Sequence, residues 1–323
     1  MTNLISLMKR RVGYRQCILR ITVCLFALTQ CPALLAANQA KILIVNSDQT
    51  VLKYQDVENA FKNQMGAFTH QMTVYDLPAD DNFEPLNQLI KNESPDLIYS
   101  IGAKAYQASV QFSANKPVLF SSVINWQRFP RSPNNYGVAN ELSLSQELSL
   151  LHYLLPAVRK IGVIYNPSIN QERINQARAQ MTELGLTLAE QTLTEPLQLD
   201  ELLQQLLPTV DALWLIADPT VLSDKDSVEK VFTATKAHNK PVYTYSDAYT
   251  KYGASLVVSA DTATMGRQAA NLAQAVLLHE PIKDPVQTPA GSHITLNVCE
   301  LGKLNVSYNS DALDAVNQLL ECH

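Results

Sequence analysis

The chain has 323 residues, of which 30 are acidic and 25 are basic. Five of the basic residues lie within the first 37 positions, so the remainder, with 20 basic against 30 acidic residues, has a net charge near −10. Such a charge argues against a nucleic-acid partner and against an anionic membrane surface, because both attract basic proteins.

The 37-residue N-terminal segment is predicted to be a secretory signal peptide. Its basic residues precede the apolar run 21–28, and a stretch of small residues ends at Ala37. The apolar run is shorter than the ~20 residues that span a bilayer as a helix. We therefore expect cleavage near Ala37 and release into the periplasm.

The cysteines raise the questions of a lipid anchor near the N-terminus and of a disulfide near the C-terminus. Cys31 raises the alternative of a lipid anchor, but Gln30 before it is larger than the small residue that lipoprotein processing requires. Only Cys299 and Cys322 follow the leader, and in an oxidising compartment an even count favours a disulfide between them. The alternative is one buried thiol and one at a frayed chain end.

Hydrophobic periodicity after the leader predicts strands that alternate with helices. In the first part of the chain the predicted strands are 41–46, 72–75, 96–101 and 117–123, and the predicted helices are 51–65, 85–92 and 103–112. In the second part the predicted strands are 160–165, 187–191, 211–216 and 241–245, and the predicted helices are 144–155, 170–184, 198–207 and 224–238. Because every crossover is helical, we expect parallel sheets.

The two parts of the chain share a repeated pattern. The tetrapeptide Asn-Lys-Pro-Val occurs in each part, preceded by a Lys-Ile strand that ends in Asn and by an apolar strand led by Asp. The matching segments are 115–118 with 239–242, 41–46 with 160–166, and 96–101 with 211–216. The length suffices for two cores, so we predict an α/β protein of two Rossmann-like lobes with a ligand cleft between them.

Two predicted strands, 254–259 and 294–298, and the helix 262–279 lie outside the repeat. If each lobe takes one strand, the chain crosses between the lobes more than once, which makes a hinge that closes along one axis. The expected crossings are near 124–142, 256–260 and 280–292. This assigns 1–37 to the signal peptide, 38–140 plus 259–282 to lobe one, and 141–258 plus 283–323 to lobe two.

The carboxyl ends of parallel strands are where such sheets bind ligands, so the residues after each strand are the candidate site. Gly102 opens a helix whose free N–H groups attract a carboxylate, and Asp218 and Asp247 in the other lobe can hold an ammonium. A strand-to-helix turn or a helix cap explains the same residues without a ligand. The full set is Ser47, Gln49, Gly102, Ala103, Lys104, Ser121, Ser122, Tyr165, Asn166, Asp218, Thr220, Ser246 and Asp247.

The sequence lacks the signatures of catalysis. It has no Gly-x-Ser-x-Gly elbow, no Gly-rich phosphate loop, no His-Glu-x-x-His and no Cys-x-x-Cys, and its six histidines show no metal-ligand spacing. We therefore expect no enzymatic activity, no cofactor and no metal.

An ordered series of fragments resembles the ABC transporter substrate-binding protein family. The fragments are 160–168, 183–186, 210–213, 240–242, 246–247, 253–254 and 265–270, within a span from Lys41 to Val306. The resemblance implies the type I periplasmic-binding-protein fold, in which two lobes close over a small ligand and deliver it to a membrane permease. The family includes binders of tryptophan and other aromatic amino acids.

The resemblance also bears on the candidate site. Gly102, Ser121, Ser122, Asp218, Thr220 and Asp247 fall where the family places cleft residues. The family commonly shows Asp-Asn-Thr near residue 218 and Asp-Glu-Gly near residue 247, whereas this chain has Asp-Pro-Thr and Asp-Ala-Tyr. The acids are retained and their neighbours differ, which leaves the ligand open.

We expect a monomeric, periplasmic solute-binding protein that serves an inner-membrane ABC permease. Its expected ligand is an amino acid, with aromatic ones first, held by its carboxylate at Gly102 and Ser122 and by its ammonium at Asp218 or Asp247. The alternative is a ligand-sensing module that signals to a membrane receptor, and a third hypothesis is a structural or chaperone-like pair of lobes. The genes beside this one would separate these.

Overall fold

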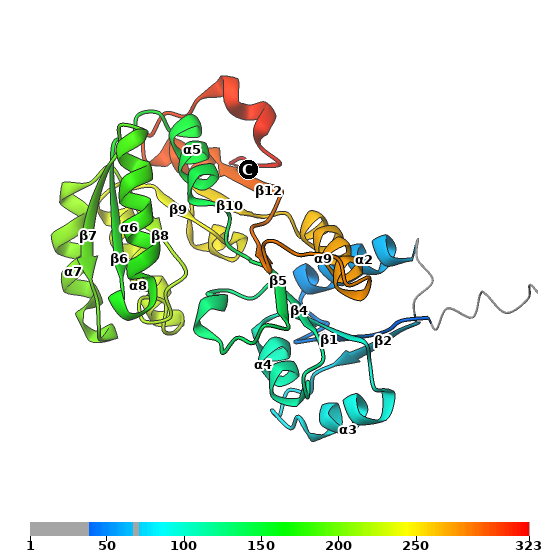
Figure 1. The fold of residues 1–323 in the computed structure, drawn as a ribbon. Coiled ribbons are helices and arrows are strands. Elements are labelled where there is room, and N and C mark those ends of the chain that lie inside the picture. The colour runs from blue at the N-terminus through cyan, green and yellow to red at the C-terminus, as the bar shows by residue number, and fades with distance from the viewer. Residues whose placement is uncertain (1–38, 67–70, 323) are drawn as a thin grey trace, which may run out of the picture. The chain divides into compact units, whose positions relative to one another are not determined.

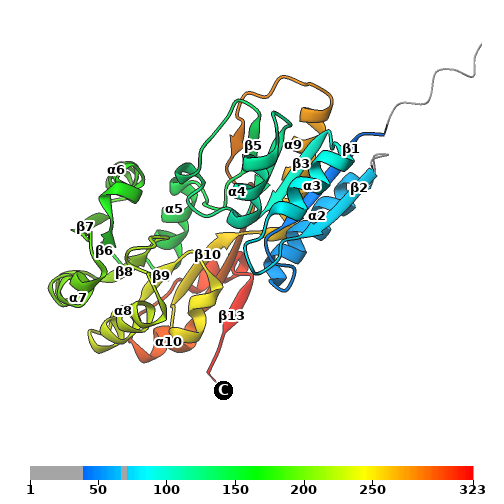
Figure 2. The same ribbon diagram turned by 90° about the horizontal axis from the view of Figure 1, so that it is seen from below.

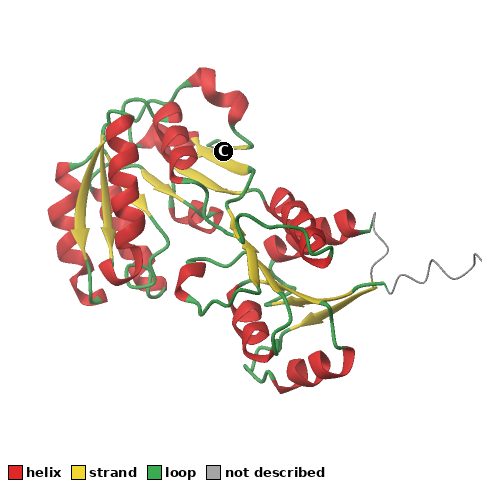
Figure 3. Ribbon diagram, in the orientation of Figure 1, coloured by secondary structure: helices red, strands yellow, loops and turns green. Residues whose placement is uncertain are grey.

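The computed structural model describes residues 39–66 and 71–322. The predicted signal peptide and Cys31 lie outside these residues. Residues 40–323 form one compact unit, and the strands described in it belong to a six-stranded and a seven-stranded sheet, with helices packed against both (Figures 1 and 3). No helix in the described part of the chain is long and apolar enough to cross a membrane.

The six-stranded sheet is parallel throughout, with the order β11-β5-β4-β3-β1-β2. Its strands are β1 (Lys41–Asn46), β2 (Gln71–Asp76), β3 (Leu97–Ile101), β4 (Val118–Ser121), β5 (Asn135–Val138) and β11 (Val286–Gln287). The helices that pack with it are α2 (Leu52–Met65), α3 (Glu84–Glu93), α4 (Ala103–Phe112) and α9 (Thr262–Leu277).

Helices cover both faces of this sheet because both sets of side chains on its central strands are apolar. In β1, Ile42 and Ile44 belong to the same buried cluster as Phe61 of α2. Leu43 and Val45 point the other way, into the cluster that holds residues of α3 and α4. The continuous apolar run of the strand therefore predicts the doubly covered sheet that forms.

The seven-stranded sheet has the order β13-β12-β10-β9-β8-β6-β7. Its strands are β6 (Lys160–Tyr165), β7 (Thr187–Thr192), β8 (Ala212–Leu215), β9 (Val242–Thr244), β10 (Leu256–Ala260), β12 (Ser292–Asn297) and β13 (Gln318–Leu320), the last of which runs to the C-terminus in red in Figure 2. Its helices are α5 (Leu144–Leu154), α6 (Pro167–Glu183), α7 (Leu199–Leu206), α8 (Lys225–Ala237) and α10 (Val298–Lys303).

The repeat predicted from the sequence is present in the structure. The order β2-β1-β3-β4 in one sheet matches β7-β6-β8-β9 in the other. Each Asn-Lys-Pro-Val segment leads into the fourth strand of its set, and Asn115 and Asn239 both adopt the left-handed conformation, with φ of 73° and 51°. Asparagine tolerates this conformation better than most residues, so both copies make the same turn before the strand.

One strand departs from the predicted parallel arrangement, because β12 runs antiparallel to β10. Between these strands the chain enters the first sheet, where α9 packs against α2 and β11 pairs with β5. It therefore returns to the second sheet in the opposite direction.

The pairing of β11 also corrects the lobe assignment, since it places residues 286–287 in the first sheet and not with 283–323 in lobe two.

The sequence analysis missed four short elements, β5, β11, α10 and β13, which have four, two, six and three residues. Segments of this length are too short for hydrophobic periodicity to reveal them. The three strands among them form by pairing with strands that are distant in the sequence.

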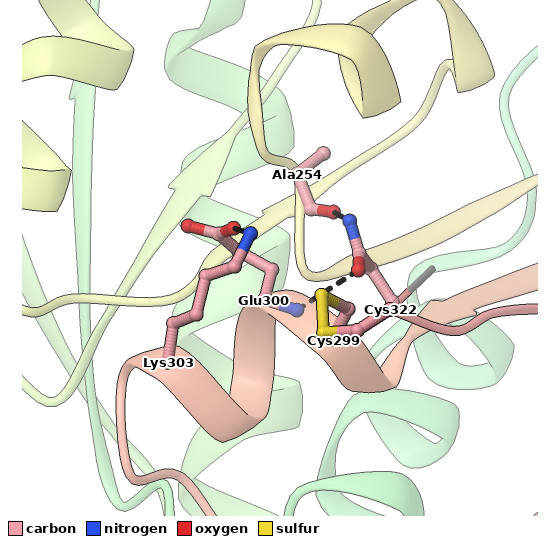
Figure 4. The surroundings of a disulfide bond; sticks show 6 residues. Ala254, Cys299, Glu300, Lys303 and Cys322 are labelled. Atoms are coloured by element: carbon pink, nitrogen blue, oxygen red, sulfur yellow. Dashed lines mark hydrogen bonds and ion pairs between the residues drawn. A yellow bond between two sulfur atoms is a disulfide. The ribbon is translucent and has the colours of Figure 1, made fainter.

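The C-terminal tail is attached to the second sheet in two ways. β13 pairs with β12, and Cys322 beyond it forms a disulfide with Cys299 in α10, with the Cα atoms 4.9 Å apart (Figure 4). Beside the disulfide, Asn297 Nδ2 donates to the carbonyl of Ala254 at 3.2 Å. The pairing predicted from the cysteine count is therefore present.

Reduction of the Cys299–Cys322 disulfide is expected to lower the free energy of unfolding by ~3 kcal/mol. The two cysteines are 23 residues apart, and the bond removes conformational entropy from the unfolded chain. Denaturant titration with and without reductant measures the difference, and the double variant Cys299→Ala/Cys322→Ala should not respond to reductant. Two free thiols in the denatured, unreduced mature protein would show that the bond does not form.

Candidate ligand-binding site

A small cavity lies where the chain crosses between the two sheets. Its polar lining includes Asn125 after β4, Glu141 between β5 and α5, Arg173 on α6, Tyr245 after β9 and Ser259 in β10. The cavity offers about 20 Å³ to water-sized atoms, which is room for about one water. A larger cavity of about 180 Å³ adjoins it and shares Asn125, Glu141 and Arg173.

Arg173 is held in place by a buried carboxylate and an aromatic ring. Its Nη2 donates to Oε2 of Glu147, and Nε1 of Trp214 donates to the other oxygen of Glu147 at 3.1 Å. The guanidinium carbon of Arg173 lies 5.7 Å from the centre of the Trp214 ring. Among the described residues, this pairing uses one of the five N–H donors of the guanidinium, so a fixed cation with further donors stands at the cavity wall.

Glu141 brings a carboxylate to the wall of both cavities. Its Oε1 accepts a hydrogen bond from the backbone N–H of Asn125 at 2.5 Å. Its Oε2 is shielded from solvent and has no hydrogen-bond partner among the residues that the structure describes. Burial raises the pKa of Glu141, and the Asn125 N–H and the charge of Arg173 act against this rise.

The loop after β4 is connected to the second sheet beside these charges. Asn125 Nδ2 donates to the carbonyl of Ala217, just after β8, at 2.8 Å. Asn125 therefore contacts Glu141 through its backbone and Ala217 through its side chain. The cavity combines a positioned cation, an incompletely paired carboxylate and segments from both sheets, which is an arrangement suited to a small ligand with both charges.

The model of the family described as ABC transporter substrate binding protein matches residues 40–319. The chain belongs to this family. A curated relative, the tyrosine-binding protein of Clostridioides difficile strain R20291, is 24% identical over 225 residues. The match covers 67% of this chain and 64% of the relative, so it spans slightly less than two thirds of that protein.

Solved structures of the family have the same fold. The ligand-free, open structure of a substrate-binding protein with adhesive properties from Clostridium difficile has a TM-score of 0.69 at 19% identity and covers 88% of this chain and 100% of its own. A domain from Streptococcus pneumonia in complex with L-Trp has a TM-score of 0.61 at 18% identity, with coverage of 87% and 99%. The fold is that of the type I periplasmic binding proteins, and the family is one of substrate-binding proteins and not of enzymes.

In this substrate-binding protein none of the thirteen residues predicted from strand ends borders either of the two cavities. Their immediate neighbours do, including Ala217 before Asp218 and Tyr245 before Ser246. The ends of strands in the second sheet therefore do border the cavity, but through the residues next to those that were predicted.

Asp218 already has hydrogen-bond partners within the protein. It is 1% exposed, and its Oδ2 accepts from the Asn166 N–H at 2.7 Å and from Asn170 Nδ2 at 2.8 Å. Its Oδ1 accepts from the N–H groups of Thr220 at 2.9 Å and Val221 at 3.3 Å. These four donors satisfy the carboxylate, which attaches the loop after β8 to the start of α6.

Asn166 and Thr220 belong to the same structural network. Asn166 caps α6 by accepting from the Ser168 N–H at 3.0 Å, and its Nδ2 donates to Thr220 Oγ1 at 2.9 Å. Tyr165 Oη donates to Glu190 Oε2 at 3.1 Å. Tyr165 and Asn166, the two polar residues predicted from the end of β6, therefore both have hydrogen-bond partners within the second lobe.

Asp247 does bind an ammonium, but it is that of Lys53 on α2, at 2.8 Å. Its other oxygen accepts from Thr295 Oγ1 at 2.9 Å, and Ser246 before it caps the 3₁₀ helix Asp247–Tyr252 by accepting from the Ala248 N–H. Burial alone would raise the pKa of Asp247, but Lys53 and Thr295 outweigh it and hold the pKa below its usual value. This ion pair joins a helix of the first sheet to the second sheet.

The predicted carboxylate site at Gly102 is also occupied by the protein. The Gly102 N–H donates to the carbonyl of Ser121 at 2.9 Å, and Ser47 Oγ accepts from the Ala105 N–H at 2.9 Å. Gly102 has φ of 87°, and a Cβ there would lie 2.5 Å from Ser47 Oγ, so the glycine is explained by this close approach. Ala103 begins α4 directly after it.

The other predicted side chains of the first lobe have partners within that lobe. Ser121 Oγ lies 2.7 Å from Tyr99 Oη, and Ser122 Oγ donates to Met265 Sδ at 3.6 Å. Lys104 Nζ donates to the carbonyl of Pro78 at 2.6 Å and pairs with Asp81 at 2.8 Å. The backbone N–H of Gln49 donates to Asp76 at 3.0 Å. These residues organise the strand ends of the first sheet.

The residues of the candidate site that the sequence analysis did not name are Asn125, Glu141, Asn170, Arg173 and Tyr245. A signal existed for the first two, because they lie within the predicted crossing 124–142, where a charged side chain stands beside the cleft. Arg173 is one of many polar residues on α6, and the sequence does not distinguish it from them. Among residues 39–66 and 71–322, no group of three or more His, Cys, Asp or Glu side chains forms a metal site.

Proposed function

We propose that this protein is the periplasmic solute-binding component of an ABC importer and that it captures an amino acid, with aromatic ones first, between its lobes. The observation that carries the proposal is the pair of opposite charges, Arg173 and Glu141, on the wall of the same two cavities. A free amino acid carries a carboxylate and an ammonium a few ångströms apart. A site with one fixed cation and one carboxylate complements both.

The relatives support the choice of ligand class. One is named a tyrosine-binding protein, and another was solved with L-Trp. In the cavity, Tyr245 offers an aromatic wall beside the charges, together with the apolar side chains of Ile216 and Val258. Such a lining suits the side chain of an aromatic or large apolar amino acid.

Capture requires the lobes to move. The small cavity has room for about one water, so an amino acid must occupy it together with the adjoining space of about 180 Å³. The chain passes between the sheets at 139–143, at 261 and at 288–291, and these short connections allow hinge motion of one lobe against the other. The closed, loaded form would then be the one that the permease recognises.

Calorimetry and thermal unfolding with the twenty amino acids test the proposal. The protein is first unfolded and refolded to remove any ligand retained during purification. At least one amino acid should bind, and at a hundred times its Kd it should stabilise the fold by about 2.7 kcal/mol. Ribose is a suitable control that should not bind, because it has no charge for Arg173 or Glu141. If no amino acid binds the refolded protein, the proposed ligand class is wrong.

A further inference from the structure

We propose that Glu141 binds the ammonium of the ligand, so that the site accepts only solutes with a free amino group. This inference rests on the proposed function, and it names the group on which selection depends. It replaces Asp218 and Asp247 as the ammonium partner. Four buried or half-buried carboxylates of this region, Asp218, Asp247, Glu147 and Glu141, differ in the number of partners that the protein supplies to them.

Three of these carboxylates are already paired by the protein. Asp218 accepts from four donors, and Asp247 pairs with Lys53 and Thr295. Glu147 pairs with Arg173 through one oxygen and with Trp214 through the other. A ligand ammonium would have to displace one of these partners to reach any of the three.

Glu141 differs because only one of its oxygens is used. Its Oε2 is shielded from solvent and has no donor within the described residues. A buried carboxylate oxygen without a donor is unfavourable, and an ammonium supplies three N–H donors and a compensating charge. The ligand therefore completes a hydrogen-bond set that the protein leaves incomplete.

The position of Glu141 also fits the second charge of the ligand. Arg173 borders the same two cavities, and its charge acts on the carboxyl of Glu141. The ligand carboxylate can reach the free N–H groups of Arg173 while its ammonium reaches Glu141. Because Glu147 holds Arg173 and the Asn125 N–H holds Oε1 of Glu141, neither side chain needs to reorganise when the ligand arrives.

Glu141 lies on the connection between β5 and α5, where the chain passes from one sheet to the other. Its partner Asn125 also donates to Ala217 of the second lobe. A ligand held at Glu141 therefore contacts the segment that must bend during closure. Binding of the ammonium and closure of the lobes are coupled at this residue.

The test compares Glu141→Gln with wild type in calorimetry, using the amino acid that binds best and its analogue without the amino group. Glutamine keeps the size of the side chain and the acceptor for Asn125 but removes the charge. The variant should bind the amino acid at least about thirtyfold more weakly, because truncating a buried charge partner typically has this effect. Wild type should bind the deaminated analogue at least about thirtyfold more weakly than the amino acid, and Glu141→Gln should not weaken it further.

Glu201→Gln is the matched control, because Glu201 on α7 is exposed, accepts from Gln205 at 3.0 Å and borders neither cavity. It should change affinity less than about threefold, as expected for an exposed charge. If Glu141→Gln does not fold, Glu141→Asp, which retracts the carboxylate by one methylene, should show the same loss.

The outcomes separate this inference from the proposed function. Equal binding of the amino acid by wild type and the Glu141 variant overturns the inference and leaves amino acid capture standing. If wild type binds the deaminated analogue as tightly as the amino acid, the inference is likewise overturned and amino acid capture is left standing. Failure of wild type to bind any amino acid overturns the proposed function, and this inference with it.

Discussion

Asp218→Ala is expected to lower the free energy of unfolding by about 3 kcal/mol or more, because each buried donor that loses its acceptor costs about 1–3 kcal/mol. The carboxylate is 1% exposed and accepts from Asn166, Asn170, Thr220 and Val221. Alanine leaves these four donors without a partner, and each buried unsatisfied donor is unfavourable. Urea denaturation followed by circular dichroism measures the loss.

Asp224→Ala is the matched control for this prediction. Asp224 also follows the β8 region and caps a helix, α8, by accepting from the Ser227 N–H at 2.8 Å, but its side chain is exposed. Its replacement removes one surface cap and should cost much less than the replacement of Asp218. If the two variants are equally stable, Asp218 does not hold the loop as described.

Glu147→Ala should also lower the free energy of unfolding by about 3–5 kcal/mol. Glu147 is 4% exposed and pairs with both Arg173 and Trp214 Nε1. Alanine leaves the arginine charge and the indole N–H unpaired and opens a cavity next to Leu148 and Leu151 on α5. The same variant should bind the ligand more weakly, because Arg173 loses the contact that positions it.

Glu229→Ala provides the control for Glu147→Ala. Glu229 pairs with Lys225 at 3.1 Å in the same lobe, but the side chains are 47% and 75% exposed. A pair this exposed contributes less than about 1 kcal/mol, since water screens it. Thermal and urea unfolding of the two variants side by side distinguish a buried pair from a surface one, and similar losses would show that burial of Glu147 has no special effect.

Most helices and strands of the fold could be predicted because the pattern of apolar and polar residues within each segment indicates its structure. The apolar runs of β1, β3, β6 and β8 are each buried on both faces, and the repeated segments around Asn115 and Asn239 mark the same turn in both lobes. The disulfide was predicted from the count of cysteines after residue 37. What escaped prediction were β5, β11 and β13, which form only because distant strands provide their pairing partners.

The candidate site shows the limit of the same reasoning. The sequence placed Asp218 and Asp247 at strand ends, and both are there, but it could not show that Asn170 and Lys53 reach them from other elements. Those donors are 48 positions before Asp218 and 194 positions before Asp247 along the chain. A carboxylate at a strand end is available to a ligand only if the fold brings no internal donor to it.

The two-lobed α/β architecture, its internal repeat and the C-terminal disulfide can thus all be predicted from the amino-acid sequence. Strand and helix periods and cysteine pairing are properties of neighbouring residues or of composition. The charges that remain for a ligand cannot be predicted in this way, because they depend on the partners that folding brings to each polar atom. Glu141 emerges as the candidate since packing buries its Oε2 and supplies no donor to it among the described residues.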